Sequence, residues 1–187
     1  AGMLGVKHAE AIAELGGIPV IVDTDLERCD QVAEQIRKEF KVNCIAAPAD
    51  ITDPQQVVKL CDSLLEDCGH LDILINNAAN NPSVGSGGLD QVHDSRMEAF
   101  PLEVWNQDIA VGLTGAFLCA RTFGEVMAQK GKGVILNIAS DLALISPDQR
   151  LYRKSGLPEQ AQSVKPVTYS VVKSGLIGLT RYLATYW

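Results

Sequence analysis

Short apolar runs alternate along the chain with longer stretches in which apolar residues recur every three or four positions. Runs of this length are typical of buried strands, which we expect at 18–23, 42–47, 71–75 and 133–138. The longer stretches predict helices at 7–15, 26–40, 54–67, about 101–129 and 168–187. Because strands and helices alternate at βαβ spacing, we predict an α/β fold with a mostly parallel, doubly wound sheet.

Two polar segments interrupt this alternation. The first is rich in glycine, serine, asparagine and proline and runs from Asn80 to about Leu89. The second, at about 147–166, has the composition of an inserted loop. We find no internal repeat or domain boundary, so we expect a single domain over 1–187.

Composition narrows the choice of partners. The 187 residues carry a net charge of −7, which disfavours nucleic acid and anionic membranes as partners and points to a small-molecule substrate. The apolar runs are shorter than a membrane span. The five cysteines lack metal-binding spacing, so we expect no metal site and reduced thiols in a cytoplasmic protein.

Two glycines near the first residue have the spacing of a phosphate-binding turn. Gly2 and Gly5 enclose Met3 and Leu4 directly before a predicted helix. Glycine lets backbone N–H groups approach a pyrophosphate at a helix N-terminus, where the helix dipole favours an anion. These four residues therefore predict a dinucleotide-binding turn.

A carboxylate follows at the end of the next predicted strand. Asp23 lies 18 residues past Gly5, where it can accept hydrogen bonds from the ribose hydroxyls of an adenosine. It would repel a 2′-phosphate, and no Lys or Arg follows it directly, so we predict NAD rather than NADP as the cofactor. The alternative is that Asp23 and Asp25 together cap the next helix.

Further polar residues follow the next two predicted strands. Asp50 and Ile51 come after the second strand, where they could touch the adenine edge. The segment Asn76-Asn77-Ala78-Ala79 comes after the third. Open α/β sheets bind ligands at the carboxyl ends of their strands, so these residues are candidates for the same cofactor site.

A tyrosine and a lysine lie one helical turn apart in the last predicted helix. The ordinary pKa of a phenol is about 10, and a neighbouring ammonium favours the phenolate. Tyr169 and Lys173 therefore predict a proton donor and acceptor that works near neutral pH. The alternative is an ordinary pair on an amphipathic helix.

Taken together, these motifs resemble the short-chain dehydrogenase/reductase family over nearly the whole chain. Asn76 to Ala79 is similar to the family's Asn-Asn-Ala-Gly element, with Ala79 in place of the glycine. Asn137-Ile138-Ala139-Ser140 resembles the strand that ends in the catalytic serine, and Tyr169 with Lys173 resembles the catalytic pair. The resemblance implies a Rossmann fold and NAD-dependent oxidation or reduction of an alcohol or carbonyl group.

The resemblance also implies a role for each site residue. Ser140 would hydrogen-bond the substrate oxygen, Tyr169 would transfer the proton, and Lys173 would lower the tyrosine pKa and bind the nicotinamide ribose. Asn76 would tie neighbouring strands together. The nicotinamide side of the site would be lined by Asn77, Ala78 and Ala79.

One departure concerns the proton relay. The family usually has an asparagine in the long helix, within a stretch that here reads Val111-Gly112-Leu113-Thr114-Gly115. Gly112 has no side chain with which to order the relay water. Either water acts there without that side chain, or another group takes its place.

A second departure concerns the inserted loop. Ser140 and Tyr169 are 29 residues apart, about twice the family's usual separation, and the excess is the segment at about 147–166. Arg150, Arg153 and Lys154 in this segment could bind a phosphate or carboxylate of the substrate. The alternative is a solvated surface loop.

The third departure concerns the ends of the chain. The family's first strand and C-terminal strands have no counterpart here, so we expect a fragment with an incomplete sheet. The first strand would lie between the strands that end at Asp23 and Ile75, and its absence would leave backbone groups unpaired. We expect the isolated chain to be unstable or inactive, and the full-length form to be a homo-oligomer by analogy.

Two segments resemble a narrower group. Residues 140–152 and 169–187 are similar to bacterial flagellin-modification oxidoreductases, which are associated with surface sugars; this implies an aminosugar, sugar-phosphate or nucleotide-sugar substrate. Two other functions stay open. A nucleotide-sugar epimerase or dehydratase shares the Tyr–Lys pair and the glycine spacing, and a non-catalytic dinucleotide-binding protein is favoured by Gly112.

Overall fold

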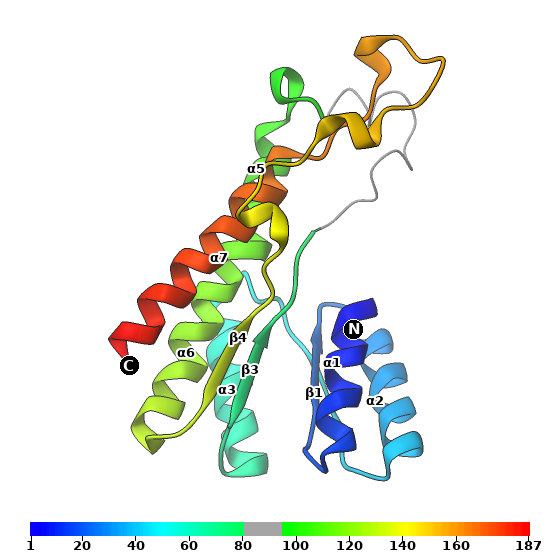
Figure 1. Cartoon of the computed structure of the whole chain (residues 1–187). Helices are drawn as coiled ribbons and strands as arrows, with labels where there is room; N and C mark the ends of the chain where they lie inside the picture. The colour runs from blue at the N-terminus through cyan, green and yellow to red at the C-terminus, as the bar shows by residue number, and fades with distance from the viewer. Residues whose placement is uncertain (81–94) are drawn as a thin grey trace. The chain divides into compact units, whose positions relative to one another are not determined.

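The computed structural model describes residues 1–80 and 95–187 (Figure 1). The described chain divides into two compact units, one formed by 1–72 with 121–133 and the other by 73–120 with 134–187. The expected glycine-rich loop lies outside the described residues apart from Asn80. The expectation of a single domain stays a prediction.

The first unit is a parallel strand pair with its helices. Its elements in chain order are α1 (Met3–Glu14), β1 (Val20–Asp23), α2 (Leu26–Phe40), β2 (Ile45–Pro48) and α3 (Pro54–Cys68). The register places Val20 opposite Ile45 and Asp23 opposite Pro48. Parallel strands need a crossover connection, and α2 supplies it, so the predicted βαβ alternation is confirmed here.

Local capping signals set the helix ends in this unit. The Asp25 side chain accepts a hydrogen bond from the Arg28 N–H at 3.1 Å and so begins α2. Asp53 accepts one from the Gln55 N–H at 2.8 Å, directly before Pro54 at the start of α3. Gly69, with φ of 73°, ends α3 in the left-handed conformation that glycine adopts without strain.

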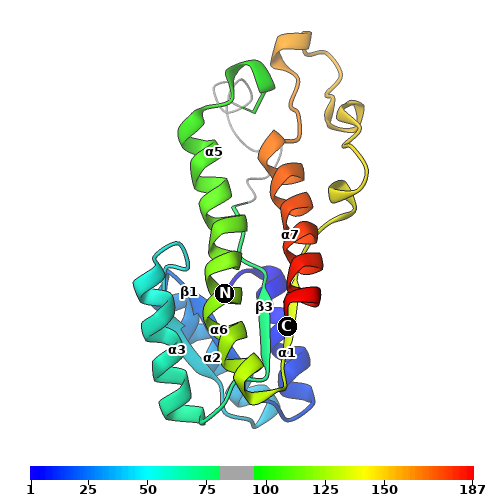
Figure 2. The same ribbon diagram turned by 90° about the vertical axis from the view of Figure 1, so that its left-hand side faces the viewer.

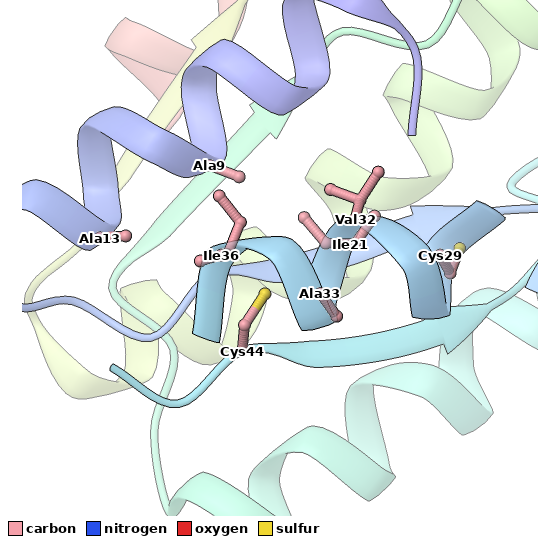
Figure 3. Packing of buried hydrophobic residues seen from close by; sticks show 8 residues of the cluster. All are labelled: Ala9, Ala13, Ile21, Cys29, Val32, Ala33, Ile36 and Cys44. Atoms are coloured by element: carbon pink, nitrogen blue, oxygen red, sulfur yellow. The ribbon is translucent and has the colours of Figure 1, made fainter. Parts of the chain in front are cut away.

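The core of the first unit lies where α2 packs against α1 and the strands (Figure 3). Cys29, Ala33 and Ile36 are 0% exposed and form one stripe of α2 at helical spacing. Two alanines of α1, Ala9 and Ala13, lie beside Ile36, and their small side chains let the two helices approach closely. The cluster is completed by Ile21, Val32 and Cys44.

The second unit contains the other strand pair and the longest helices. Strands β3 (Ile73–Asn76) and β4 (Val134–Asn137) pair in parallel, with Asn76 opposite Asn137. The Asn76 amide donates to Asn137 Oδ1 at 2.8 Å and to the Ala116 carbonyl at 3.3 Å. The predicted structural role of Asn76 as a tie between strands is therefore confirmed.

A long helical run crosses this unit and includes a wider turn. It consists of α5 (Leu102–Ile109), the π-helical η2 (Ala110–Thr114) and α6 (Gly115–Lys130), whose residues from Arg121 onward belong to the first unit. The predicted long helix is thus confirmed. A π-helical turn inside an α-helix is uncommon and often marks a functional position.

The last helix, α7 (Val167–Tyr186), runs beside α5 and η2 (Figure 2). Val172 and Leu176 of α7 are buried against Ala116, with Ile109 and Leu113 packed around them. Four short 3₁₀ turns complete the unit: η1 (Met97–Ala99), η3 (Asp141–Ala143), η4 (Gln149–Tyr152) and η5 (Glu159–Ala161).

The strands form two separate two-stranded sheets, β1–β2 and β3–β4, in the described part of the chain. This agrees with the expected doubly wound sheet that is incomplete. Each strand has four residues, so the predicted strands were too long, by two residues at the start of β1 and three at the start of β2. Helix α1 begins at Met3, earlier than predicted, so the Gly2–Gly5 segment is its cap and first turn.

The structure bears on two expectations from composition, the state of the cysteines and the absence of a membrane-spanning segment. All five cysteines are free and four are buried, which agrees with the prediction of reduced thiols. Burial raises the pKa of Cys61 and Cys119 to about 11. The helical run 102–130 is long and apolar enough to span a membrane, contrary to the sequence estimate, but 44% of its most apolar window is buried inside the protein. Core helices of soluble proteins have the same character.

Candidate active site

The first unit carries the predicted pyrophosphate-binding turn at the start of α1. Gly2 is the N-cap residue, and no side chain caps the helix. Met3 and Leu4 are 80% and 51% exposed in the first turn, and Gly5 follows them. An uncapped helix N-terminus presents backbone N–H groups to an anion, so the turn fits the phosphate groups of a dinucleotide.

Asp23 lies at the carboxyl end of β1, as predicted. Burial opposes its ionisation, but hydrogen bonds from the Ala1 ammonium at 2.9 Å and from the Asp25 N–H at 3.3 Å hold its pKa below the ordinary value. The ion pair with Ala1 exists only where that residue carries a free amino group. Asp25 caps α2 and Asp23 accepts from the Asp25 N–H directly before the helix, so both carboxylates shape this helix start, and the ribose-binding role of Asp23 stays a prediction.

Asp50 lies after β2 and shapes the turn that leads into α3. Its Oδ1 accepts hydrogen bonds from the Thr52 N–H at 2.8 Å and the Thr52 hydroxyl at 2.7 Å. Ile51, beside it, is partly exposed. The carboxylate of Asp50 thus has a structural task, and Ile51 is the member of the pair with a side chain suited to an adenine face.

In the second unit, Lys173 ties α7 to the end of β4. Its side chain is buried, with the residue 6% exposed, and Nζ donates to the Ile138 carbonyl at 2.6 Å. Nζ also lies 5.8 Å from the centroid of the Tyr169 ring. Burial lowers the pKa of Lys173, and the nearby Lys165 ammonium lowers it further. The predicted Tyr–Lys pair therefore lies together at the end of a strand.

Ser140 follows two residues after Ile138 and begins η3. Its hydroxyl donates to Asp141 Oδ1 at 2.8 Å and accepts from the Leu142 N–H at 3.2 Å. The Ser174 hydroxyl of α7 donates to the Ala143 carbonyl at 3.0 Å, which holds η3 against the helix that carries Tyr169. In this state the Ser140 proton is engaged by Asp141 and must turn away from it to reach a substrate.

Tyr169 lines a small cavity of about 10 Å³, room for about one water molecule. Two polar residues that sequence reasoning missed, Asp108 and Thr168, share its wall. The sequence signal for Asp108 was an acidic residue four positions before Gly112, one helical turn away. The lining is Ala79, Asn80, Asp108, Gly112, Thr168, Tyr169, Val172 and Lys173. Asn77 and Ala78 precede this wall in the segment after β3.

Packing explains why Gly112 stands where the family has asparagine. A Cβ at this position would lie 2.6 Å from Val172 Cγ1, closer than carbon atoms approach. Val172 is buried, so it has little room to move. The side chain expected at position 112 is therefore excluded by the residue that precedes Lys173.

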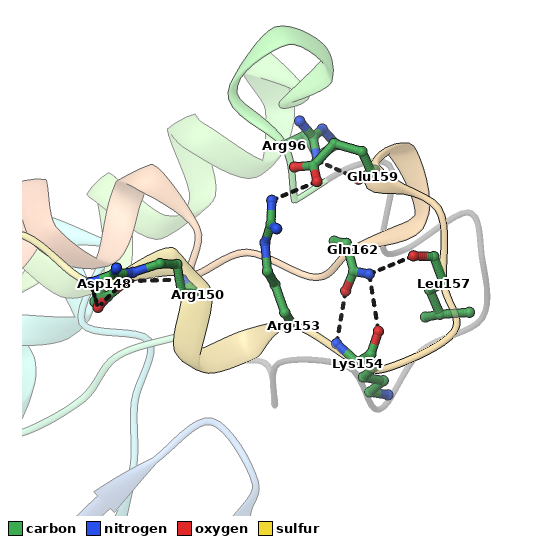
Figure 4. Close-up of polar contacts among 8 residues, drawn as sticks. All are labelled: Arg96, Asp148, Arg150, Arg153, Lys154, Leu157, Glu159 and Gln162. Carbon is green, nitrogen blue, oxygen red and sulfur yellow. Dashed lines mark hydrogen bonds and ion pairs between the residues drawn. The ribbon is translucent and has the colours of Figure 1, made fainter.

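The inserted loop places its arginines in local ion pairs (Figure 4). Arg150 binds Asp148 with Nε and Nη2 at 2.8–3.2 Å, and Arg153 Nη2 lies 2.5 Å from Glu159 Oε2. Gln162 is buried and its amide donates to the Lys154 and Leu157 carbonyls. Each arginine thus already has a carboxylate partner, and Arg96 from outside the segment donates to the Glu159 carbonyl at 3.1 Å.

A further cation of this segment, Lys165, contacts the tyrosine itself, a contact that was not predicted from the sequence. Lys165 Nζ is 3.8 Å from the Tyr169 ring centroid, within cation–π range. Burial lowers the pKa of Lys165. Two ammonium groups therefore lie near the Tyr169 ring: Lys165, just before α7, and Lys173, one turn further along it.

Comparisons with known proteins identify the family. The family model described as short chain dehydrogenase matches residues 1–152. An uncharacterized oxidoreductase of Thermotoga maritima is 32% identical over 182 residues, and D-threitol dehydrogenase of Mycolicibacterium smegmatis is 27% identical over 184 residues. The matches cover 97% and 98% of this chain but only 60% of each relative, so the chain spans well under two thirds of their length.

A solved structure shows the same fold. The short-chain type dehydrogenase/reductase from Mycobacterium marinum is 26% identical to this chain and superimposes with a TM-score of 0.78. The match covers 98% of this chain and 64% of that one.

The fit of Gly112 against Val172 predicts opposite effects at two helix glycines. Gly112→Ala should destabilise the full-length protein by about 1–3 kcal/mol because the new methyl group collides with Val172. Gly178→Ala on α7, where a Cβ meets nothing within 4 Å, should stabilise it by up to about 1 kcal/mol. Denaturant unfolding of both variants measures the difference.

The matched rescue is Gly112→Ala with Val172→Ala. The second change removes the colliding methyl groups, so the double variant should be more stable than the sum of its single variants. Strict additivity would show that Val172 is not what excludes a side chain at 112.

Proposed function

This chain belongs to the short-chain dehydrogenase family, and from that premise we propose that the full-length protein is an NAD-dependent oxidoreductase acting on an alcohol or carbonyl group. The observation that carries the proposal is the placement of Tyr169 beside Lys173, with Lys173 bound to the strand end that leads into Ser140. The match of residues 1–152 confirms the family expected from the motifs.

The proposed cofactor residues fit a nicotinamide dinucleotide, which members of this family bind. The uncapped α1 turn from Gly2 to Gly5 would hold its pyrophosphate. Asp23, with Asp50 and Ile51, would meet the adenosine half. When bound, the cofactor supplies the hydride chemistry. The proposed contacts on the nicotinamide side are Asn77, Ala78, Ala79, Tyr169 and Lys173.

The chain's own residues would handle the proton and the substrate oxygen. Ser140 would donate to that oxygen after its hydroxyl leaves Asp141. Tyr169 would take the alcohol proton during oxidation and return it during reduction. The Lys173 ammonium, already fixed by the Ile138 carbonyl, would stabilise negative charge on the phenolic oxygen and bind the nicotinamide ribose.

The substrate we propose is a sugar or sugar derivative. D-threitol dehydrogenase, by its name, acts on a sugar alcohol, and the resemblance of 140–152 and 169–187 to flagellin-modification oxidoreductases favours a role in surface-glycan synthesis. Arg150, Arg153 and Lys165 would recognise an acidic group on that substrate. The two arginines would first have to give up part of their pairing with Asp148 and Glu159. A cytoplasmic location and a homo-oligomer belong to the same proposal.

The absence of the asparagine at position 112 favours one rival, a protein that binds NAD without catalysis. That rival predicts tight NAD binding and no turnover on any alcohol. An epimerase or dehydratase predicts product without net reduction of NAD. A screen of sugar alcohols, sugars and nucleotide sugars with the full-length protein, read as absorbance of reduced nicotinamide and as product, separates the three functions.

The proton-transfer role predicts the effect of removing one oxygen. Tyr169→Phe in the full-length protein should lower kcat by roughly 10²- to 10⁴-fold because no general acid or base remains. NAD affinity, measured by fluorescence titration, should change little. Tyr182→Phe, on the same helix and 61% exposed, is the control and should leave kcat unchanged. Near wild-type turnover in Tyr169→Phe would exclude the proposed role.

The choice of NAD over NADP should depend on Asp23. Asp23→Ser removes the carboxylate that binds ribose hydroxyls and repels a 2′-phosphate, so the ratio of NAD to NADP affinity should fall roughly 10-fold or more. Asp25→Ser keeps a residue able to cap α2 and should leave the ratio unchanged. The two dissociation constants are measured for each variant, and equal ratios in all three proteins would refute the assignment.

The role of the loop cations should appear in KM. Arg150→Ala with Arg153→Ala, and separately Lys165→Met, should raise KM for phosphorylated or acidic sugars several-fold and leave KM for neutral sugar alcohols unchanged. Lys38→Ala, an exposed cation of α2, is the control. KM values that change equally for acidic and neutral substrates would contradict this role.

A further inference from the structure

Asp108 is the buried residue of α5, although its side chain is a carboxylate. The residue is 8% exposed and lies one turn before Gly112 on the same helix face. Taking a carboxylate out of water costs several kcal/mol unless other groups offset it. Because Asp108 shares a cavity with Tyr169 and Lys173, we consider a role for its carboxylate in the proposed reaction.

The hydrogen-bond partner of Asp108 is Thr168, the residue directly before Tyr169 in sequence. The Thr168 hydroxyl donates to Asp108 Oδ2 at 2.5 Å, and Thr168 is only 2% exposed. Both residues line the water-sized cavity that Tyr169 and Lys173 also line. The helix that would normally supply the relay asparagine thus supplies a carboxylate four residues earlier.

Packing excludes a side chain at position 112 but leaves Asp108 in the wall of the cavity. Val172 closes position 112 to any side chain, because a Cβ there would lie 2.6 Å from it. The cavity of about 10 Å³ holds about one water, which needs two to four polar partners. Asp108, Thr168, Tyr169 and Lys173 all line this cavity and supply such partners.

We propose that Asp108, held by Thr168, positions the water that carries the proton between Tyr169 and solvent, in place of the asparagine that Gly112 lacks. The inference rests on the proposed function. In alcohol oxidation a bound cofactor would supply the hydride acceptor. The substrate hydroxyl proton would pass to the Tyr169 oxygen, then to this water and on to solvent. Reduction reverses these steps. Asp108 accepts a hydrogen bond from the water throughout and is a positioning residue.

The test compares Asp108→Asn with matched variants of the full-length protein. Asp108→Asn should lower kcat roughly 10-fold or more, leave KM and NAD affinity within about two-fold, and increase the solvent deuterium isotope effect on kcat, because proton transfer becomes slower. Thr168→Val should also lower kcat and increase the isotope effect. Thr168→Ser, which keeps the hydroxyl, should leave kcat and the isotope effect at their wild-type values. Glu103→Gln, an exposed acid of α5, should change neither.

A readout independent of turnover is a high-resolution crystal structure of the full-length protein. It should show an ordered water within hydrogen-bond distance of Asp108 and of Lys173 or Tyr169. An empty cavity, or an unchanged isotope effect in both Asp108→Asn and Thr168→Val, would overturn the inference while wild-type turnover upholds the proposed function. If Asp108→Asn does not fold, the Thr168→Val and Thr168→Ser pair decides. Absence of turnover in the wild type would overturn both.

Discussion

The hydrogen bond from the Lys173 ammonium to the Ile138 carbonyl is the contact on which the candidate active site depends. It joins the middle of α7 to the end of β4 at 2.6 Å, across 35 residues of sequence. Burying an ammonium is costly, which is why the pKa of Lys173 is lowered, and the carbonyl offsets part of that cost. The same bond places Tyr169, one turn earlier on α7, near the segment that begins at Ser140.

Packing around the small cavity determines which residues supply its polar groups. A β-branched residue at 172 fills the space into which a side chain at 112 would point. The helix then accommodates a glycine within a π-helical turn, where the family usually has asparagine. Asp108 and Thr168 supply polar groups instead, so the cavity keeps polar lining residues although the asparagine expected at position 112 is absent.

In the inserted loop, local carboxylates compete with a ligand for the arginine side chains. Its arginines look available in the sequence, but each is paired with a carboxylate of the same loop. The partner is two residues from Arg150 and six residues from Arg153. Local partners cost little chain entropy to bring together, so they compete well with a ligand. Lys165, at the end of the same loop, is instead carried onto the face of Tyr169 by the start of α7.

Local signals in the sequence determined the order of helices and strands, the caps at Asp25 and Asp53, and the spacing of Tyr169 and Lys173. These depend on residues within a few positions of each other, which is the range that periodicity and capping describe. Only the tertiary structure decided that Asp108 meets Thr168, 60 residues away, and that Val172 closes position 112. Burial and close contact between distant segments arise from how helices pack, and no pattern within one segment encodes them.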